Sequence, residues 1–244
     1  MSDPSVSVVV AHYDRRAWLS EALESIVAQT FRSFEVIVVS DGGPLHELPG
    51  TRVVRHVERR GVAAARNTGV GAARGPRIAY LDDDDLWAPD HLARLSAALD
   101  AGAELAYGDA RVVRLAPGDG PPGEWPVRDE LVLAVPFDRD DLARDDFVVP
   151  GGMMHTRALY DRVGPFDETL FVSDDWDWLL RAATLVNFVR VPSVVVTVRI
   201  HGANLSGAVD PRRRAALDEL QRRHGTPPLE PKTFWEVAQT YANR

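Results

Sequence analysis

The sequence predicts an α/β protein in which a mostly parallel central sheet is flanked by helices. Three observations support this prediction. Short runs of β-branched residues alternate with helical patterns through residues 1–110. Strands separated by helices pair in parallel through right-handed crossovers. Each strand pattern also runs into polar residues, and parallel α/β sheets bind their ligands beyond the carboxyl ends of the strands.

The first half of the chain carries four expected strands and three expected helices. Leu19, Leu23 and Ile26 fall on one face of a helical pattern that begins at Trp18. Pro89 suits the first turn of a later helix. The expected strands are residues 5–10, 34–39, 51–57 and 77–81, and the expected helices are residues 18–27, residues 61–73 and a segment that starts near residue 89.

The second half of the chain is less regular. Glycine and proline between residues 116 and 126 indicate an exposed loop. We expect a strand over 147–154 with a break at Gly151-Gly152, and two strand segments within 188–200 that are separated by Pro192. Helices are expected over residues 156–163, 174–184, 211–224 and 233–241.

Composition restricts the classes of function. The 244 residues include no cysteine, which excludes disulfides, thiolate zinc sites and cysteine nucleophiles. The formal charge of −8 disfavours nucleic acid as a partner, because binding to phosphates needs a basic face. No apolar run approaches the roughly 18 residues of a membrane span, and no signal-peptide pattern precedes Val6. We therefore expect a cytoplasmic protein without a membrane span.

Four consecutive aspartates, Asp82 to Asp85, follow the expected strand at 77–81. Adjacent carboxylates repel one another unless a cation offsets their charge. Mg²⁺ or Mn²⁺ held by one or two carboxylates completes its shell with water and substrate phosphates, so the cluster indicates a metal-bound nucleotide diphosphate. The alternative is a solvated acidic turn that caps the helix near Pro89. Tyr13, Asp41 and the aspartates all follow strand ends, so we expect them to gather on one rim.

The sequence resembles the family 2 glycosyltransferases between Ser5 and Ser206. Any single block of the match is weak, but their shared order and spacing make the match specific. The blocks are SVVVAHYDR at 7–15, QTF at 29–31, FEVIVVSDG at 34–42, ARNTG at 65–69, LDDDD at 81–85, MH at 154–155, VG at 163–164, FDE at 166–168 and DDWD at 174–177. The resemblance implies a GT-A-like (Rossmann-like) fold with a mixed, mostly parallel sheet and inverting transfer from a nucleotide sugar.

By the same resemblance, residues 1–210 form the glycosyltransferase domain. Residues 1–110 are its nucleotide-sugar-binding half and residues 111–210 its acceptor-binding half. Residues 211–244 form a C-terminal helical extension, which could pack on the core, cover the acceptor site or form a homodimer contact.

The resemblance assigns six residues to the nucleotide sugar. Tyr13 flanks a uracil or thymine ring, and Asp41 accepts a hydrogen bond from the imide N–H of that ring, so the donor is a UDP- or dTDP-sugar. The alternatives are core packing for Tyr13 and a turn cap for Asp41. Arg66 contacts the diphosphate or pairs with the aspartate cluster, and an ordinary surface salt bridge is its alternative. The full set is Ala11, Tyr13, Asp41, Arg66, Asp82 and Asp83.

The metal site is assigned to Asp84 and His201. Asp84 is the final aspartate of the motif in either register of the four aspartates. His201 belongs to an Arg199-x-His201 motif with Asn204 and Ser206, and its alternative is a solvated loop histidine. Asp85 is expected to cap the next helix.

Asp175 is the expected general base, which takes the proton of the acceptor hydroxyl. Its alternative is an N-terminal helix cap. We expect Asp177 and Arg181, four residues apart, to form a structural ion pair. The acceptor is assigned to Gly152, Met153, Asp174 and Trp176, although Gly151-Gly152 could also be a simple turn.

Two further functions stay open from sequence. A metal-dependent nucleotidyltransferase would normally carry a glycine-rich, basic phosphate loop, which residues 11–16 lack. A non-catalytic module that binds sugar nucleotides or glycans would need Tyr13 and Asp41 but not both Asp84 and Asp175. The sequence also departs from the family pattern, with Ala11-His12 before the tyrosine and Ser40-Asp41 in place of a double aspartate.

Overall fold

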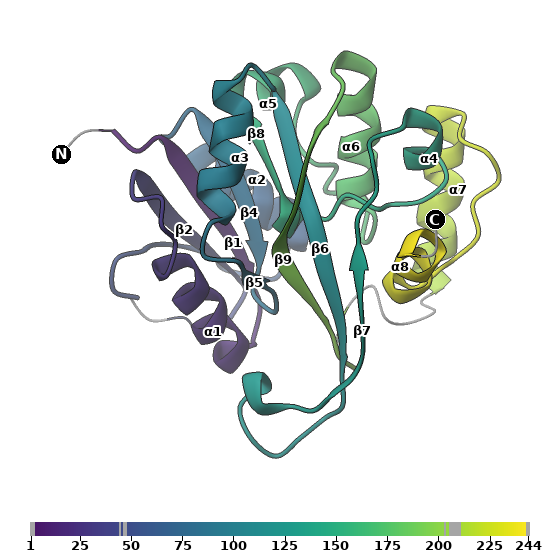
Figure 1. The fold of residues 1–244 in the computed structure, drawn as a ribbon. Coiled ribbons are helices and arrows are strands. Elements are labelled where there is room, and N and C mark those ends of the chain that lie inside the picture. The colour runs from purple at the N-terminus through teal and green to yellow at the C-terminus, as the bar shows by residue number, and fades with distance from the viewer. Residues whose placement is uncertain (1–2, 44, 46–47, 203, 205–210, 243–244) are drawn as a thin grey trace.

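A computed structural model describes residues 3–43, 45, 48–202, 204 and 211–242. Within these residues the strands form one nine-stranded sheet in the order β3-β2-β1-β4-β8-β6-β9-β5, with β7 paired to β6 (Figure 1). The strands are β1 (Val6–His12), β2 (Phe34–Asp41), β3 (Arg52–His56), β4 (Arg77–Asp82), β5 (Leu86–Trp87), β6 (Leu105–Leu115), β7 (Val127–Leu133), β8 (Met153–Thr156) and β9 (Val189–Ile200).

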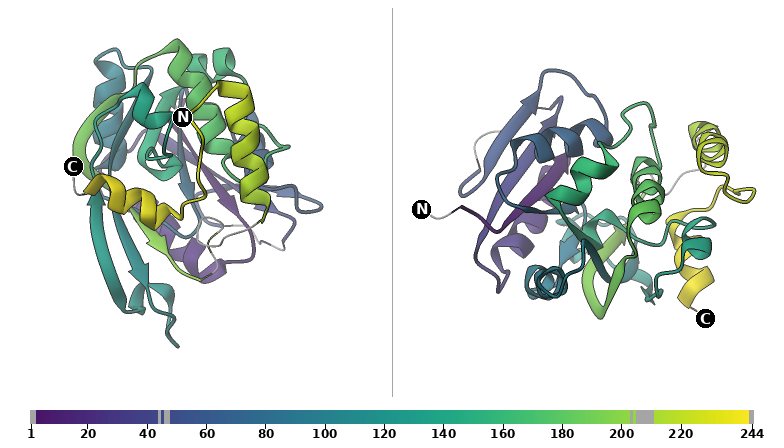
Figure 2. Two further views of the ribbon diagram at one scale, coloured as in Figure 1. Left: turned by 90° about the vertical axis from the view of Figure 1, so that its right-hand side faces the viewer. Right: turned by 90° about the horizontal axis from the view of Figure 1, so that it is seen from above.

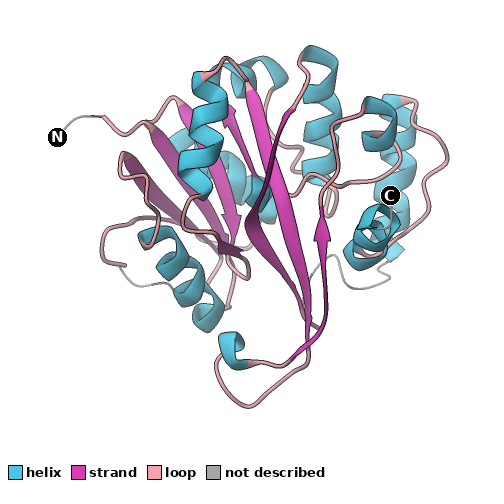
Figure 3. Cartoon of the chain, in the orientation of Figure 1, coloured by secondary structure: helices cyan, strands magenta, loops and turns pink. Residues whose placement is uncertain are grey.

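Helices flank both faces of the sheet, as the cartoon in Figure 3 and the views in Figure 2 show. Helices α1 and α3 lie on one face, and α2, α5 and α6 lie on the other. The helices are α1 (Arg16–Val27), α2 (Val62–Ala72), α3 (His91–Asp100), α4 (Arg139–Leu142), α5 (Arg157–Val163), α6 (Asp174–Leu185), α7 (Pro211–His224) and α8 (Phe234–Ala242), with 3-10 turns η1 (Pro122–Glu124) and η2 (Pro150–Gly152).

The first four strands confirm the predicted parallel arrangement. Strand β1 pairs in parallel with β2 and β4, and β2 pairs in parallel with β3. Val8 and Val10 on one face of β1 and Val9 on the other are all buried, as expected for a strand covered on both faces. Gly69 lets α2 approach this strand closely, because a Cβ at that position would lie 2.3 Å from Cγ1 of Val9.

The second half of the sheet is mixed. Strand β8 is antiparallel to β4 and β6, whereas β9 runs parallel to β6. The strand expected over 147–154 is wrong, because Pro150 begins a 3-10 turn and the strand starts only at Met153. The two segments expected around Pro192 form one strand instead, and shifts of register at Gly108 and Asp109 of β6 accommodate the irregularity. Strands β5, β6 and β7 and helix α4 were not predicted.

The C-terminal helices pack on the same core as the sheet. Leu217 and Leu220 of α7 and Val237 and Tyr241 of α8 belong to the hydrophobic cluster that contains β1 and β4. The predicted domain boundary at residue 210 lies outside the described residues, as does Ser206 of the late motif. None of the helices described here combines the length and the apolar character that a membrane span requires.

Candidate active site

The carboxyl ends of three parallel strands line one cleft, which has a volume of about 230 Å³. Ala11 and His12 come from the end of β1, Asp41 from the end of β2 and Asp82 from the end of β4. Tyr13 and the other three aspartates of the cluster line the same cleft. The predicted rim is therefore confirmed, and it lies where parallel α/β sheets bind ligands.

Tyr13 and Asp41 form one end of the cleft. The Tyr13 side chain is 39% exposed, with the Arg59 guanidinium 4.1 Å from its ring centroid, so core packing is excluded as its role. Asp41 is buried and accepts the backbone N–H of Arg60 and of Gly61, each at 2.8 Å. Its Oδ1 also lies 2.7 Å from Nδ1 of His56. Asp41 thus fixes the turn before α2 while lining the cleft.

Arg66 joins the end of β4 to the start of α6. Its guanidinium is buried and donates to Asp174 at 2.9 Å and to Asp82 at 3.1 Å, so it does not form a surface salt bridge. Burial opposes its charge, but these carboxylates and Asp175 outweigh that effect and raise the pKa of Arg66. Burial raises the pKa of Asp174 to about 7. The guanidinium is therefore a fixed positive charge below the floor of the cleft.

Each aspartate of the cluster has its own partners, which relieves the repulsion between the four carboxylates. Asp85 does not cap α3. It accepts the backbone N–H of Arg199 at 2.9 Å, and burial raises its pKa well above the usual range. The partners are Arg66 for Asp82, His12 and the Tyr13 N–H for Asp83, Arg15, His201 and Asn204 for Asp84, and Arg199 for Asp85.

Asp84 and His201 come together, as their joint assignment requires. His201 Nε2 and Asn204 Nδ2 each lie 3.1 Å from Oδ2 of Asp84, and Arg15 donates to the same oxygen. His201 is only 6% exposed and stacks on Trp18 with ring centroids 4.2 Å apart, so it is not a solvated loop histidine. Burial opposes the charge of Asp84, but His201 and Arg15 outweigh it and lower the pKa of Asp84.

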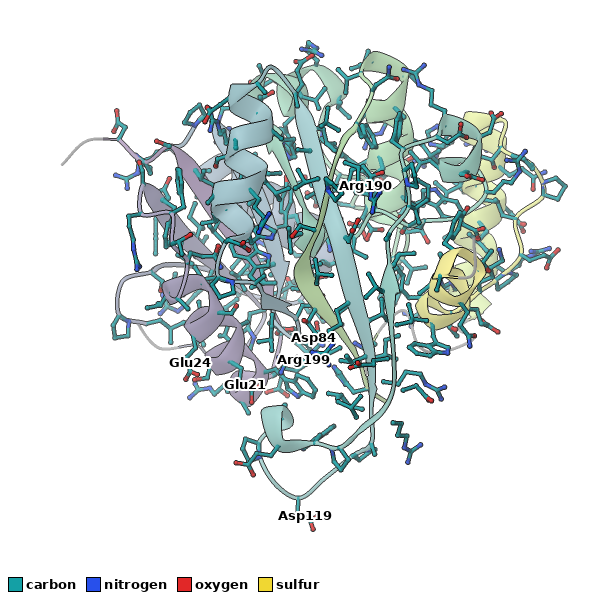
Figure 4. The ribbon with its side chains drawn as sticks, in the orientation of Figure 1. Glu21, Glu24, Asp84, Asp119, Arg190 and Arg199 are labelled. Carbon is teal, nitrogen blue, oxygen red and sulfur yellow. The ribbon has the colours of Figure 1, made fainter. Side chains whose placement is uncertain are left out.

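The donor set at this point fits Mg²⁺ or Mn²⁺. No three histidine, aspartate or glutamate side chains among the described residues form a complete metal site. A carboxylate and an imidazole do meet, and a hard divalent cation takes its other ligands from water and substrate phosphates. Arg15 on the Asp84 carboxylate shows that this position stabilises positive charge. Figure 4 shows Asp84, Arg199 and Glu21 beside α1, where Arg199 pairs with Glu21.

Asp175 lies in the first turn of α6 and lines the cleft. Its Oδ1 accepts the Trp176 N–H at 2.9 Å, which satisfies one of the unpaired N–H groups of the first turn. Ser173 holds the N-cap position without a side-chain cap bond, so Asp175 supplies part of the capping of α6 while it also lines the cleft. Oδ2 lies 3.9 Å from Nη1 of Arg66. As predicted, Asp177 pairs with Arg181, at 2.9 Å.

Three residues assigned to the acceptor lie in the core instead. Gly152 and Met153 are buried beneath the cleft, and the lining is formed by Val149 and Pro150 just before them. A Cβ on Gly152 would lie 3.1 Å from Cγ2 of Val149, so this glycine serves close packing. Trp176 is buried and donates its indole N–H to the carbonyl of Leu142 at 2.7 Å. Asp174 does line the cleft but is bonded to Arg66.

The sequence left open that the C-terminal helices cover the acceptor site, but it assigned no residue of the far wall of the cleft to the site. These residues come from separate segments, and no local motif connects them. They are Asp146 in the loop after α4, Phe171 and Val172 before α6, Arg213 on α7, and Phe234 and Val237 on α8. Arg15 was also missed, although it closely follows Tyr13 in the first block of the family match.

Comparison with known proteins identifies the family. The model for "Glycosyl transferase family 2" matches residues 7–163, which is more than half of the chain. The chain belongs to glycosyl transferase family 2. It is 35% identical over 239 residues to the uncharacterized glycosyltransferase YwdF of Bacillus subtilis, covering 94% of this chain and 87% of YwdF. It is 31% identical to the succinoglycan biosynthesis protein ExoO of Rhizobium meliloti, covering 90% of this chain and 71% of ExoO.

Solved structures show the same fold. S. aureus TarS 1–349 in complex with UDP-GlcNAc has a TM-score of 0.67 at 18% identity, over 89% of this chain and 66% of TarS. The mannosyltransferase PcManGT of Pyrobaculum calidifontis, in complex with GDP-Man and Mn²⁺, has a TM-score of 0.65 at 22% identity, over 99% of this chain and 70% of PcManGT. The fold is GT-A, and the family membership makes this protein a glycosyltransferase rather than a nucleotidyltransferase or a non-catalytic module.

Proposed function

We propose that this glycosyltransferase moves a sugar from a UDP- or dTDP-sugar to an acceptor hydroxyl with inversion at the anomeric carbon. The observation that carries the proposal is the single cleft that Tyr13, Asp41, Asp84 and Asp175 line together, with His201 bonded to Asp84. The bound UDP-GlcNAc of TarS and GDP-Man of PcManGT support a nucleotide-sugar donor.

The base of the donor packs on the exposed ring of Tyr13, where Arg59 already lies 4.1 Å from the centroid. A carboxylate oxygen can accept two hydrogen bonds. Oδ2 of Asp41 accepts one from Gly61, so a second acceptor position remains for the imide N–H of uracil or thymine. Guanine presents a larger ring with a different donor pattern, and the nucleotide comparison below tests this choice directly.

Asp84 and His201 would hold a divalent cation together with the donor diphosphate. When bound, Mg²⁺ or Mn²⁺ offsets the negative charge that develops on the departing diphosphate. Arg15 lies on the same Asp84 oxygen, and its side chain is partly exposed. We expect it to donate to a phosphate oxygen once the donor enters the cleft. Asp83 is held by His12 and keeps the end of β1 against the end of β4.

Asp175 accepts the proton of the acceptor hydroxyl as the hydroxyl oxygen attacks the anomeric carbon. The nearby Arg66 guanidinium and Asp174 hold the start of α6, so the carboxylate is presented to the cleft rather than to solvent. The bond to the diphosphate breaks in the same displacement. One displacement inverts the centre, so an α-linked donor gives a β-glycoside.

The test is a thermal-shift comparison of UDP, dTDP and GDP, each with and without Mn²⁺, because a ligand that binds the native state raises its apparent stability. We expect UDP and dTDP to stabilise the protein more than GDP does, and more with Mn²⁺ than without it. Asp84→Asn removes the Mn²⁺-dependent increment. Asp100→Asn, which removes an exposed carboxylate paired with Arg77, leaves the increment unchanged. Preference for GDP, or a full increment in Asp84→Asn, contradicts the donor assignment.

A further inference from the structure

The end of the cleft opposite Tyr13 combines carboxyl groups with an apolar wall. Asp146 and Asp175 line it together with Phe171, and the C-terminal helices add Arg213, Phe234 and Val237. We call this set the acceptor end. Its residues come from one loop, the segment before α6, and helices α6, α7 and α8.

One carboxyl oxygen of the acceptor end has no hydrogen-bond partner among the described residues. Oδ1 of Asp146 is buried and makes no hydrogen bond among the described residues. An unsatisfied buried polar group costs about 1–3 kcal/mol, and such groups are rare in native proteins. The neighbouring Asp145, by contrast, lies 2.5 Å from Nζ of Lys232. Asp146 therefore lines the cleft and has unused hydrogen-bonding capacity at its buried Oδ1.

The apolar wall is held in place by contacts outside the cleft. The Arg212 guanidinium lies 3.6 Å from the ring centroid of Phe171. At the start of α8, Glu236 accepts the backbone N–H of Thr233 at 2.7 Å and its hydroxyl at 2.9 Å, which fixes Phe234 between them. The Lys232–Asp145 pair joins this helix start to the loop that carries Asp146. The wall is thus already formed without a ligand.

Resting on the proposed function, we propose that the acceptor is a pyranoside and that Asp146 binds a hydroxyl adjacent to the one that attacks. A pyranoside has neighbouring hydroxyls on its edge and C–H groups on its faces. Its edge would satisfy Asp146 and Asp175 together, while its face packs on Phe171 and Phe234. An acceptor with a single hydroxyl would reach Asp175 and leave Asp146 unpartnered.

The charges around Asp146 agree with a role in binding a neutral ligand. Burial raises the pKa of Asp146 well above its usual range, and the charge of Asp175 adds to the effect, although Arg213 opposes it. A carboxyl group that holds its proton can donate to a sugar hydroxyl and accept from another.

The test compares Asp146→Leu and Asp146→Asn with the control Asp109→Asn. Asp109 is also buried but is fully paired with Arg190, at 2.7 and 2.9 Å, and does not line the cleft. Protein loaded with UDP and Mn²⁺ is titrated with methyl β-glucoside, methyl β-galactoside, methyl α-mannoside and methyl N-acetyl-β-glucosaminide, with binding followed by saturation-transfer NMR. Cyclohexanol serves as the single-hydroxyl probe.

We expect at least one glycoside to bind the wild type, about tenfold more weakly to Asp146→Leu and about threefold more weakly to Asp146→Asn, with cyclohexanol and UDP unaffected. Asp146→Leu keeps or raises Tm, because it removes an unsatisfied polar group, whereas Asp109→Asn lowers Tm without changing glycoside binding. Unchanged glycoside binding in both Asp146 variants, no glycoside binding to the wild type, or a large fall in Tm for Asp146→Leu overturns the inference. Failure of the wild type to bind UDP would be a separate result, and it would contradict the proposed function itself.

Discussion

The two ends of the cleft differ in how their polar groups are satisfied. At the end formed by β1, β2 and β4, which we call the donor end, Asp41 and each of Asp82 to Asp85 have a protein partner. At the acceptor end, one oxygen of Asp146 has no hydrogen-bond partner within the part of the chain that the structure describes. The acidic groups of the donor end therefore have protein partners before any ligand enters, whereas our proposal gives the Asp146 oxygen a partner only when the acceptor binds. In this account, binding of the donor and the chemistry at Asp175 depend on different residues, so variants can change one without the other.

The largest expected effect follows from replacing Asp175, whose role is confined to the transition state. Asp175→Asn keeps the size of the side chain but cannot accept the proton. Turnover should fall by roughly 10²–10⁴-fold, the usual worth of a general base, while UDP affinity stays within about twofold. Initial rates of transfer or donor hydrolysis and calorimetric titration of UDP measure the two quantities. Asp177→Asn is the control, because Asp177 pairs with Arg181 and does not line the cleft. A larger loss of turnover in Asp177→Asn than in Asp175→Asn would identify Asp177 as the general base instead.

The next largest effect concerns stability at the junction of the two ends. Arg66→Met leaves the buried Asp174 without its cationic partner, and breaking a buried ion pair costs about 3–5 kcal/mol. Urea denaturation should show this loss in the free energy of unfolding. Arg74→Met, which removes an exposed guanidinium paired with Glu35, should cost less than about 1 kcal/mol. An equal loss of unfolding free energy in Arg66→Met and Arg74→Met would mean that Arg66 does not hold the end of β4 and the start of α6 together.

His201→Ala sharpens the contrast at the donor end. It removes one of the two proposed metal ligands, so UDP should bind about tenfold more weakly in Mn²⁺ but equally well without the metal, as titration would show. Tm should also fall slightly, because the stack on Trp18 is lost. His91→Ala provides a matched control, since His91 also stacks on a tryptophan, Trp87, but does not line the cleft or bond to Asp84 in the described residues. Equal loss of Mn²⁺-dependent affinity in both variants would make His201 a packing residue alone.

The smallest effect is a pH dependence outside the cleft. Burial opposes ionisation of Asp177, but the bonds from His224 and Arg181 outweigh it and lower the pKa of Asp177. Because the folded pKa lies below the unfolded one, its stabilisation is present above about pH 4 and is lost as the pH falls through the folded pKa. Asp177→Asn should therefore lower Tm at pH 7 by a few degrees, and the difference from wild type should shrink at pH 3. A difference that persists at pH 3 would assign the effect to packing instead.

The donor end could be predicted from the sequence because local patterns specify it. Each of its acidic residues follows a short apolar strand, and the parallel pairing of β1, β2 and β4 places those strand ends together. His12 and Arg15 were missed because they pair with Asp83 and Asp84, which lie far away in the sequence. A contact between residues so far apart leaves no periodic pattern in the sequence. The same limit applies to the contact between His201 and Trp18, which joins the end of β9 to α1.

Apart from Asp175, the residues of the acceptor end could not be predicted, since their meeting depends on tertiary packing alone. Gly152, Met153 and Trp176 are close in sequence to residues that line the cleft, yet their side chains or backbone are buried in the core. Asp146, Phe171 and Phe234 line the cleft in their place. They come from two loops and from a C-terminal helix to which the sequence assigns no single role. Strands β6 and β7 were missed because an antiparallel pair joined by a loop has no helix between its strands.

The central claim is that both ends act in a single displacement across this one cleft. NMR of the anomeric proton tests it directly, using the α-linked donor whose nucleotide binds most tightly and following the first sugar product before mutarotation, with water as the acceptor if no glycoside reacts. The account predicts that the β-anomer forms first and that Asp175→Asn slows its formation. An α-anomer as the first product would contradict the single displacement and the role given to Asp175.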